Sequence, residues 1–268
     1  MEPVKKNLLI KLFIIISIII SHKLYAADIT VGATTWYAQS EQYYTQNKAA
    51  YFMSNALVKS YSAFLYGPTL SVRFSNDFNL TFVYLLGNFE TVKDDGSFKY
   101  RSKYRRSDSD LALNYRLSDY FKVFLGLKYL SYDIIPADTD NSTFQIRNID
   151  PHKSYGAGLG LSATIPIVGN LFVLGTVSGL YLFGKDKVGV TNHNSAANPR
   201  SVNLDYNEYG VNSTIALAYY IVPASTVISL GGRLQYLVAN YKNNAIFLDS
   251  IKFTIYGVTL TATYTFSL

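Results

Sequence analysis

The sequence predicts an all-β protein: a closed, antiparallel up-and-down barrel that crosses a membrane with about ten strands, eight to twelve being compatible with the pattern. Three observations predict this fold. Apolar and polar residues alternate with a period of two in many segments, short and long connections alternate along the chain, and most segments have one apolar and one polar face. A period of two is typical of a strand, whose successive side chains point to opposite sides.

The clearest alternation lies in residues 110–133, which predict two strands joined by a tight turn at residues 118–120. One face is apolar and aromatic, and consists of Leu111, Leu113, Tyr115, Leu117, Phe121, Val123, Leu125, Leu127 and Tyr129. The opposite face carries Arg, Lys, Asn and Gly, with Phe124 as its one large apolar member. In a membrane barrel the apolar face contacts lipid, and the polar face lines the interior.

The other strands follow in chain order on either side of this hairpin. We predict them at residues 29–38, 66–74, 78–89, 155–165, 171–183, 208–222, 226–238 and 250–268. Segment 171–183 does not alternate cleanly, because Phe172, Leu174, Leu180 and Leu182 oppose Val173, Val177, Tyr181 and Phe183. A β-bulge near Gly175 or Gly179 is one explanation for that pattern.

The connections favour closure. Tight turns at residues 75–77, 118–120, 166–170 and 223–225 alternate with long connections at residues 39–60, 90–107, 133–153, 184–207 and 239–249. Short turns on one rim and long loops on the other are typical of membrane barrels, and closure removes the two edges of an open sheet. A secreted β-sandwich is the alternative, but its dry core would not accept the polar faces of these strands.

Residues 1–26 have the pattern of a secretory signal peptide, which leaves residues 27–268 for the barrel. Lys5, Lys6 and Lys11 form a positive end, an apolar core covers residues 12–20, and a cleavage site follows Ala26. A membrane anchor is the alternative. The apolar core is only about nine residues long, whereas a spanning helix needs about 20.

Composition agrees with export to a membrane. The chain has no cysteine, so it has neither a disulfide framework nor a thiolate metal site, and it is rich in Tyr, with 24 residues. Tyr at strand ends forms the aromatic girdles of membrane barrels. Removal of the signal peptide leaves 20 basic against 17 acidic residues, a net charge of +3. This charge is too small to indicate nucleic-acid binding.

The last strand supplies a resemblance to a known family. Val258, Leu260, Ala262, Tyr264, Phe266 and Leu268 alternate with Thr and Ser up to the final residue. This resembles the C-terminal strand of bacterial outer-membrane β-barrel proteins, although most members end in Phe or Trp. The resemblance, to small porin-like and opacity-like barrels, implies a cell-envelope protein of a Gram-negative outer membrane. It also implies contact with outer-membrane lipid and lipopolysaccharide, recognition by the barrel-assembly machinery, and a monomer.

Alternation also predicts which side chains line the interior: Arg73, Asp108, Asp110, Asn114, Arg116, Lys122, Lys128, Asn212, Arg233 and Gln235. Gly156, Gly158 and Gly160 add a strip without side chains. The two acids are too few for Arg73, Arg116, Lys128 and Arg233, so some of these bases should face water. The interior is therefore either a filled, inert core or a narrow, weakly anion-favouring pore.

Loop 90–107 is strongly basic and is predicted to face outside. It contains Lys93, Lys99, Arg101, Lys103, Arg105 and Arg106, interleaved with Tyr100 and Tyr104. Such side chains pair well with lipopolysaccharide phosphates, although a charge run is more often a solvated loop.

One constellation could be catalytic. His193 and Ser195, with Asn207 further along, resemble the pairing in outer-membrane phospholipase A and some lipid A deacylases. The pair lies within a polar loop, however, and a catalytic pair needs rigid placement. His152, beside Pro151, is predicted to lie in a loop. We therefore expect a non-enzymatic structural or surface-interaction barrel or a narrow pore, without metal or cofactor, and keep a lipid hydrolase as the alternative.

Overall fold

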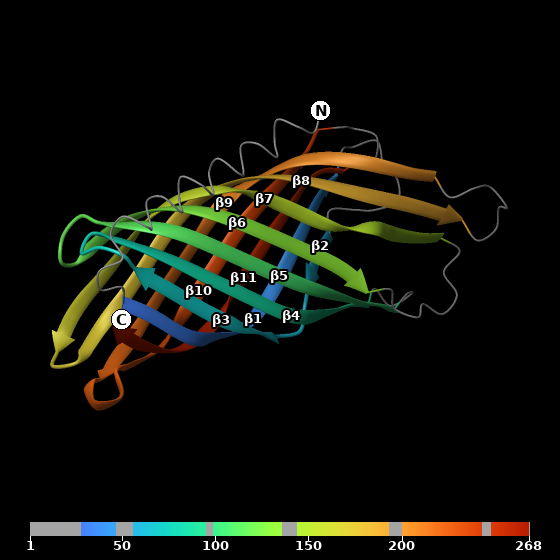
Figure 1. Cartoon of the computed structure of the whole chain (residues 1–268). Helices are drawn as coiled ribbons and strands as arrows, with labels where there is room; N and C mark the ends of the chain where they lie inside the picture. The colour runs from blue at the N-terminus through green and yellow to red at the C-terminus, as the bar shows by residue number, and fades with distance from the viewer. Residues whose placement is uncertain are drawn as a thin grey trace.

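The computed structural model describes residues 28–46, 56–94, 99–135, 144–192, 200–242 and 248–267 as an almost purely β protein (Figure 1). The strands are β1 (Asp28–Gln46), β2 (Ala56–Lys59), β3 (Ala63–Arg73), β4 (Phe78–Asp94), β5 (Lys99–Arg116), β6 (Phe121–Ile135), β7 (Phe144–Val168), β8 (Leu171–Asn192), β9 (Arg200–Ile221), β10 (Thr226–Tyr241) and β11 (Leu248–Ser267). A 3₁₀ turn, η1 (Val222–Ala224), joins β9 to β10. The predicted signal peptide lies outside the described residues. Within the described ranges, no helix is long and apolar enough to cross a membrane.

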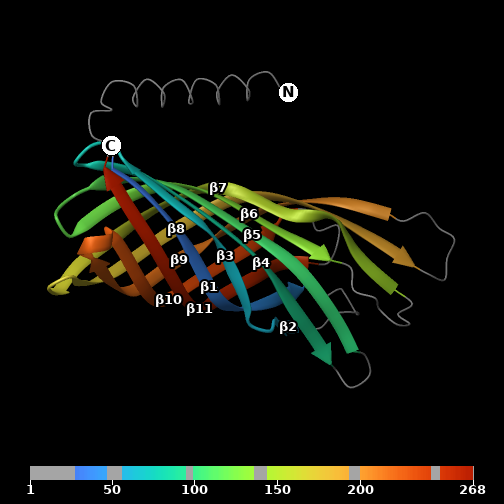
Figure 2. The same ribbon diagram turned by 60° about the horizontal axis from the view of Figure 1, so that its bottom comes forward.

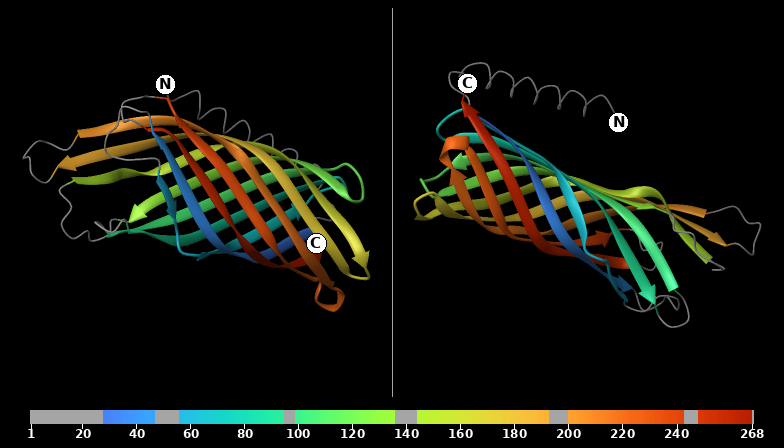
Figure 3. Two further views of the ribbon diagram at one scale, coloured as in Figure 1. Left: turned by 180° about the vertical axis from the view of Figure 1, so that it is seen from behind. Right: turned by 90° about the horizontal axis from the view of Figure 1, so that it is seen from below.

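Ten of these strands close into a barrel, which confirms the predicted fold (Figures 2 and 3). Each strand pairs antiparallel with its neighbour along the chain, and β11 pairs with β1 to complete the ring. The short β2 pairs with residues 41–44 of β1, beyond residues 28–38 of β1, which pair with β3. It therefore continues the edge that β3 forms with β1 and is not counted among the ten strands of the barrel. Across β1 and β2, Lys59 Nζ lies 2.9 Å from Glu41 Oε1, and this hydrogen bond raises the pKa of Lys59 above its ordinary value.

The outward face of the barrel is an apolar belt. Large apolar side chains are exposed on every long strand, as expected for a surface that contacts lipid. Exposed tyrosines border the belt toward the long connections, at Tyr37, Tyr66, Tyr129, Tyr155, Tyr181, Tyr209 and Tyr256, and toward the short turns, at Tyr115, Tyr120, Tyr219 and Tyr264. Tyr129 pairs with Tyr155, and Tyr181 with Tyr209, so on β6 to β9 these tyrosines form two cross-strand pairs.

The strands run further than their hydrophobic pattern predicts. The predicted loops 90–107, 133–153 and 184–207 are largely extensions of β4–β5, β6–β7 and β8–β9 beyond the belt. Beyond the lipid, neither face of a strand has to be apolar, so the alternation fades while the backbone ladder continues. Pro151 is accommodated in β7 because the register with β8 shifts between Asp150 and Lys153.

The hydrophobic core lies inside the barrel, in the half nearer the long connections, which we call the outer half. Trp36, Leu65, Phe89, Leu182 and Phe253 belong to one buried cluster. This buried cluster explains why β8 does not alternate between apolar and polar residues. Its inward Leu182 packs in the cluster, whereas its outward Tyr181 and Phe183 are exposed to lipid, so both faces are apolar. The bulge suggested near Gly175 or Gly179 is wrong, because the register of β8 with both neighbours is continuous there.

The inner glycines of β7 make room for this core. A Cβ at Gly160 would lie 2.4 Å from Phe124 Cζ, and one at Gly158 would lie 2.6 Å from Leu180 Cδ2. The strip without side chains is thus occupied by side chains from β6 and β8.

Candidate functional site in the barrel lumen

A cluster of charged side chains lies in the middle of the lumen, on β5, β6 and β10. Asp108 accepts a hydrogen bond from Arg106 Nη2 at 3.0 Å and another from Lys128 Nζ. Lys128 Nζ also donates to Asp110 Oδ1 at 2.7 Å, and Arg233 Nη2 lies 3.4 Å from Asp110 Oδ2. The side chains of Arg106 and Asp108 are 0% and 1% exposed. We call these five residues the charge cluster.

Neutral groups add further contacts to the charge cluster. Arg106 also donates to the Tyr132 hydroxyl and to Gln235 Oε1. Arg233 donates to Asn212 Oδ1 at 3.2 Å, and its guanidinium lies 4.6 Å from the centre of the Trp36 ring. Buried charges are tolerated only when they are paired and hydrogen-bonded. Each charge of the cluster lies within 4.0 Å of an opposite charge, although Arg106 Nε has no hydrogen-bond partner among the described residues. The cluster joins β5 and β6 to β10 and β1 across the lumen.

A second buried group lies further out, with members on β7, β8, β9 and β10. His152 Nδ1 and the Tyr241 hydroxyl both donate to Asp186 Oδ2, each at 2.9 Å. The imidazole stacks on the Tyr206 ring at a centroid distance of 4.3 Å. Two residues along β7 from His152, toward the short turns, Ser154 Oγ donates to the buried Glu208 at 2.6 Å. We call His152, Asp186, Tyr206 and Tyr241 the histidine cluster.

The half of the lumen nearer the short turns, the inner half, has a different lining. Hydroxyl groups bond across neighbouring strands, as in Thr30–Thr265 at 2.8 Å and Thr34–Thr69 at 2.9 Å. Asn114 belongs to the same lining and donates to the Ala112 carbonyl. Lys122, on β6, is partly buried in this half. The lumen thus changes from small polar groups in the inner half to packed aromatic and charged groups in the outer half.

Arg73 and Arg116 face water as predicted, with side chains 59% and 43% exposed, but the expectation that too few carboxylates are in reach of the bases is wrong. Arg73 Nη1 lies 3.2 Å from Asp28 Oδ2, and Arg116 pairs with Asp119 in the adjacent turn. Both pairs lie at the solvent-exposed rim, where carboxylates outside the predicted strands are in reach. Lys128 and Arg233 share Asp108 and Asp110 in the charge cluster.

The prediction that Arg106 belongs to a surface loop is also wrong. β5 continues outward from Asp108, so Arg106 shares the inward face of Asp108 and Asp110. Lys103 and Arg105 are exposed on the same strand. Lys93, Lys99 and Arg101 lie on β4 and β5, and their side chains are outside the described set.

His152 lies in β7 and is buried, so its predicted loop position is wrong. Every second residue of β7 points inward, from Gly160 through Gly158, Gly156 and Ser154. Continuing this alternation by two more residues places His152 inside the barrel. His193 and Ser195 lie outside the described residues. Asn207, the third member of the suggested catalytic group, lies in β9 and pairs with Phe183 on β8 and Asn240 on β10.

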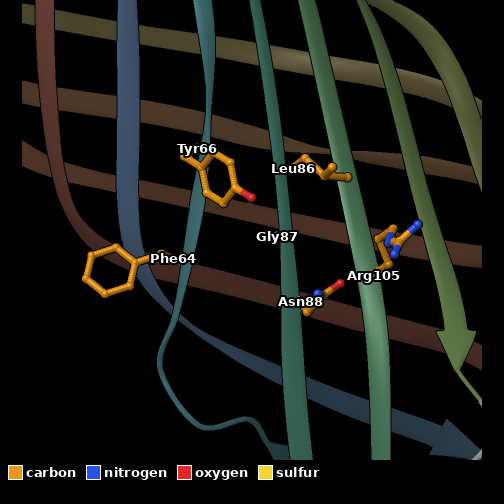
Figure 4. Close-up of a pocket in the computed structure, with 6 residues that line it drawn as sticks. All are labelled: Phe64, Tyr66, Leu86, Gly87, Asn88 and Arg105. Atoms are coloured by element: carbon orange, nitrogen blue, oxygen red, sulfur yellow. The ribbon is translucent and has the colours of Figure 1, made fainter.

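A hollow of about 310 Å³ lies on the outer surface of β3, β4 and β5 (Figure 4). Phe64 and Tyr66 border it from β3, Leu86, Gly87 and Asn88 from β4, and Arg105 from β5. It contains no pair of groups suited to acid–base chemistry. Within the described residues, no group of three or more His, Asp or Glu side chains is placed to hold a metal ion.

The fold resembles solved structures, whereas the sequence has no match: no family model matches it, and no curated protein matches it closely enough to count as a relative. The outer-membrane protease OmpT from Escherichia coli superposes with a TM-score of 0.60 at 10% identity, covering 90% of this chain and 97% of its own. The fold is that of the bacterial outer-membrane β-barrels.

Two further structures match with lower scores. The outer-membrane protein AlkL superposes with a TM-score of 0.43 at 12% identity, covering 90% of this chain and 91% of its own. OprG from Pseudomonas aeruginosa gives 0.35 at 11% identity, covering 91% and 97%. The apolar belt and the closed fold together are those of a barrel that spans a membrane.

Proposed function

We propose that this outer-membrane barrel is non-enzymatic and non-conducting, and that it acts through the surface that its long strands present outside the membrane. The observation that carries the proposal is the filling of the lumen. Arg106 and Asp108 of the charge cluster are fully buried, the Arg233 guanidinium lies over the buried Trp36 ring, and Asp108 is the register partner of the buried Leu130. Side chains of β5 and β10 meet across the lumen at this level, because Arg106 donates to Gln235 Oε1 and Arg233 Nη2 lies 3.4 Å from Asp110 Oδ2.

The outer extensions of the strands support the surface role. The pairing of β7 with β8 continues to Phe144 and Asn192, and that of β4 with β5 to Asp94 and Lys99. In contrast, the pairing of β6 with β7 ends at Tyr132 and His152. The β7–β9 sheet and the β4–β5 hairpin therefore extend beyond the belt as separate ribbons (Figure 3).

The partners belong to the same proposal. Outer-membrane lipid and lipopolysaccharide surround the belt, and the barrel-assembly machinery recognises β11 during insertion. The strand offers it the alternating Val258, Leu260 and Tyr264 on the lipid-facing side.

Conductance in a planar bilayer tests this proposal. We expect the wild-type barrel to give no resolvable single-channel current. The triple variant Arg106→Ala, Asp108→Ala, Lys128→Ala should conduct, because it empties the middle of the lumen and leaves Asp110 and Arg233 to pair with each other. Both proteins are first shown to be folded by heat-modifiable migration. A steady wild-type current would overturn the proposal and support the pore interpretation.

A further inference from the structure

The apolar belt has a furrow where two small residues replace large ones. Gly179 on β8 lies between its register partners Leu159 and Val211, and a Cβ at Gly179 would meet no atom within 4 Å. One residue pair further out, Ala157 pairs with Tyr181. The resulting hollow is about 600 Å³ in volume, and Leu125, Leu159, Tyr181, Tyr209, Val211 and Tyr236 border it.

Two lysines lie on the same outward faces, beyond the furrow. On β7, Lys153 and Tyr155 follow Ala157 outward, and on β8, Phe183 and Lys185 follow Tyr181. Lys153 and Lys185 are direct cross-strand partners, and both are exposed. Like charges directly opposite each other on antiparallel strands repel. An anion bound between the two ammonium groups would remove this repulsion.

The carboxylates around the two lysines leave room for such an anion. Asp205 Oδ1 lies 3.9 Å from Lys185 Nζ, a loose contact between exposed groups. Asp133 is exposed on β6, diagonal to Lys153, and its register partner is Arg105. Within the described part of the chain, Lys153 forms no salt bridge with a carboxylate.

We propose that Lys153, Lys185 and the furrow at Gly179 and Ala157 form one binding site for a phosphorylated glycolipid of the outer leaflet. The phosphate binds between the two lysines through charge-assisted hydrogen bonds. An acyl chain lies in the furrow, where it touches the floor and both walls and fills a gap in the belt.

The dimensions of the site match one leaflet. Gly179 and Lys185 are six residues apart, which is about 20 Å along a strand and about 14 Å along the membrane normal at a tilt near 45°. Half of a hydrocarbon core of about 30 Å is close to that height. The lysines lie just beyond the tyrosine girdle of the outer half, where phosphates of the outer leaflet are expected.

Native mass spectrometry of the barrel, titrated in mild detergent, tests the site. The probes are bis-phosphorylated lipid A, the same lipid after dephosphorylation, and phosphatidylglycerol. We expect lipid A to bind, with about tenfold weaker binding after dephosphorylation or in the variant Lys153→Gln/Lys185→Gln. Gly179→Leu should weaken binding several-fold by filling the furrow, and its side chain has open space.

Matched controls lie elsewhere on the wall. Lys252→Gln removes an exposed lysine from β11 at a similar height, and Gly232→Leu adds a side chain on the lipid-facing side of β10, where a Cβ would meet only Gly257 O, at 3.9 Å. Neither should change binding. Equal binding of phosphatidylglycerol would overturn the choice of occupant. An unchanged affinity in the lysine variant, or an equal loss in Lys252→Gln, would overturn the site.

Discussion

Asp108 is the residue on which the interior electrostatics depend. It contacts Arg106 and Lys128 directly, and Arg233 Nη2 lies 3.8 Å away. Its carboxylate is therefore the central negative charge among three buried cations. Among the described residues, Asp110 forms salt bridges with Lys128 and Arg233 and none with Arg106, so it does not replace Asp108 there.

Asp108→Ala should strongly destabilise the barrel. Breaking a buried pair by removing one partner costs about 3–5 kcal/mol, since it leaves uncompensated charge in a low-dielectric interior. The measurement is urea-induced unfolding in lipid vesicles. Asp119→Ala is the control, because its pair with Arg116 is exposed and should contribute at most about 1 kcal/mol. Equal losses in both variants would contradict the central role of Asp108.

At the scale of the element, β7 shows how a strand is shaped by what it faces. Gly126 on β6 and Gly158 on β7 are register partners, yet their surroundings differ. A Cβ at Gly126 would make ordinary contacts of 3.7 Å and longer, whereas one at Gly158 would lie 2.6 Å from Leu180 Cδ2 and 2.9 Å from a backbone oxygen.

Gly158→Ala should therefore destabilise the barrel by about 1–3 kcal/mol, the usual cost of overpacking. Gly126→Ala should be neutral, or should stabilise the fold by up to about 1 kcal/mol, because it reduces the freedom of the unfolded chain. Paired urea titrations compare the two variants. A similar effect of both substitutions would show that the difference in crowding is not energetically important.

The elements also show what the sequence can and cannot predict. Strands within the belt were predictable, because lipid on one side and polar groups on the other impose a period of two, as in the 110–133 hairpin. How far the strands continue beyond the belt was not predictable, since no apolar contrast marks Arg106 or His152 as strand residues; once the strands are known to continue, parity alone places both side chains inside. The partners of Asp108 on other strands depend on register and closure, which hydrophobic pattern alone does not specify.

On the scale of the whole molecule, closure should be visible as resistance to detergent. Unboiled barrel should migrate differently from boiled protein on an SDS gel and should fractionate with the outer membrane, because its spanning strands have no unpaired edge. Deletion of residues 248–268 should abolish the heat-modifiable form by exposing β1 and β10. Lys252→Gln should retain it. Heat-modifiable migration of the truncated protein, or recovery of the full chain as a soluble periplasmic protein, would contradict the closed membrane barrel.

The pairing of β11 with β1 sets the order in which the barrel can form. All other spanning neighbours follow each other along the chain and can pair locally as hairpins. The seam runs from Asp28 against Ser267 to Gln46 against Leu248, so it forms only after the intervening strands have been gathered. Until then, two strands carry unpaired backbone groups that hydrocarbon does not tolerate. In the absence of a partner that covers these two edges, we therefore expect all ten spanning strands to insert together, with no smaller set of hairpins persisting in the bilayer.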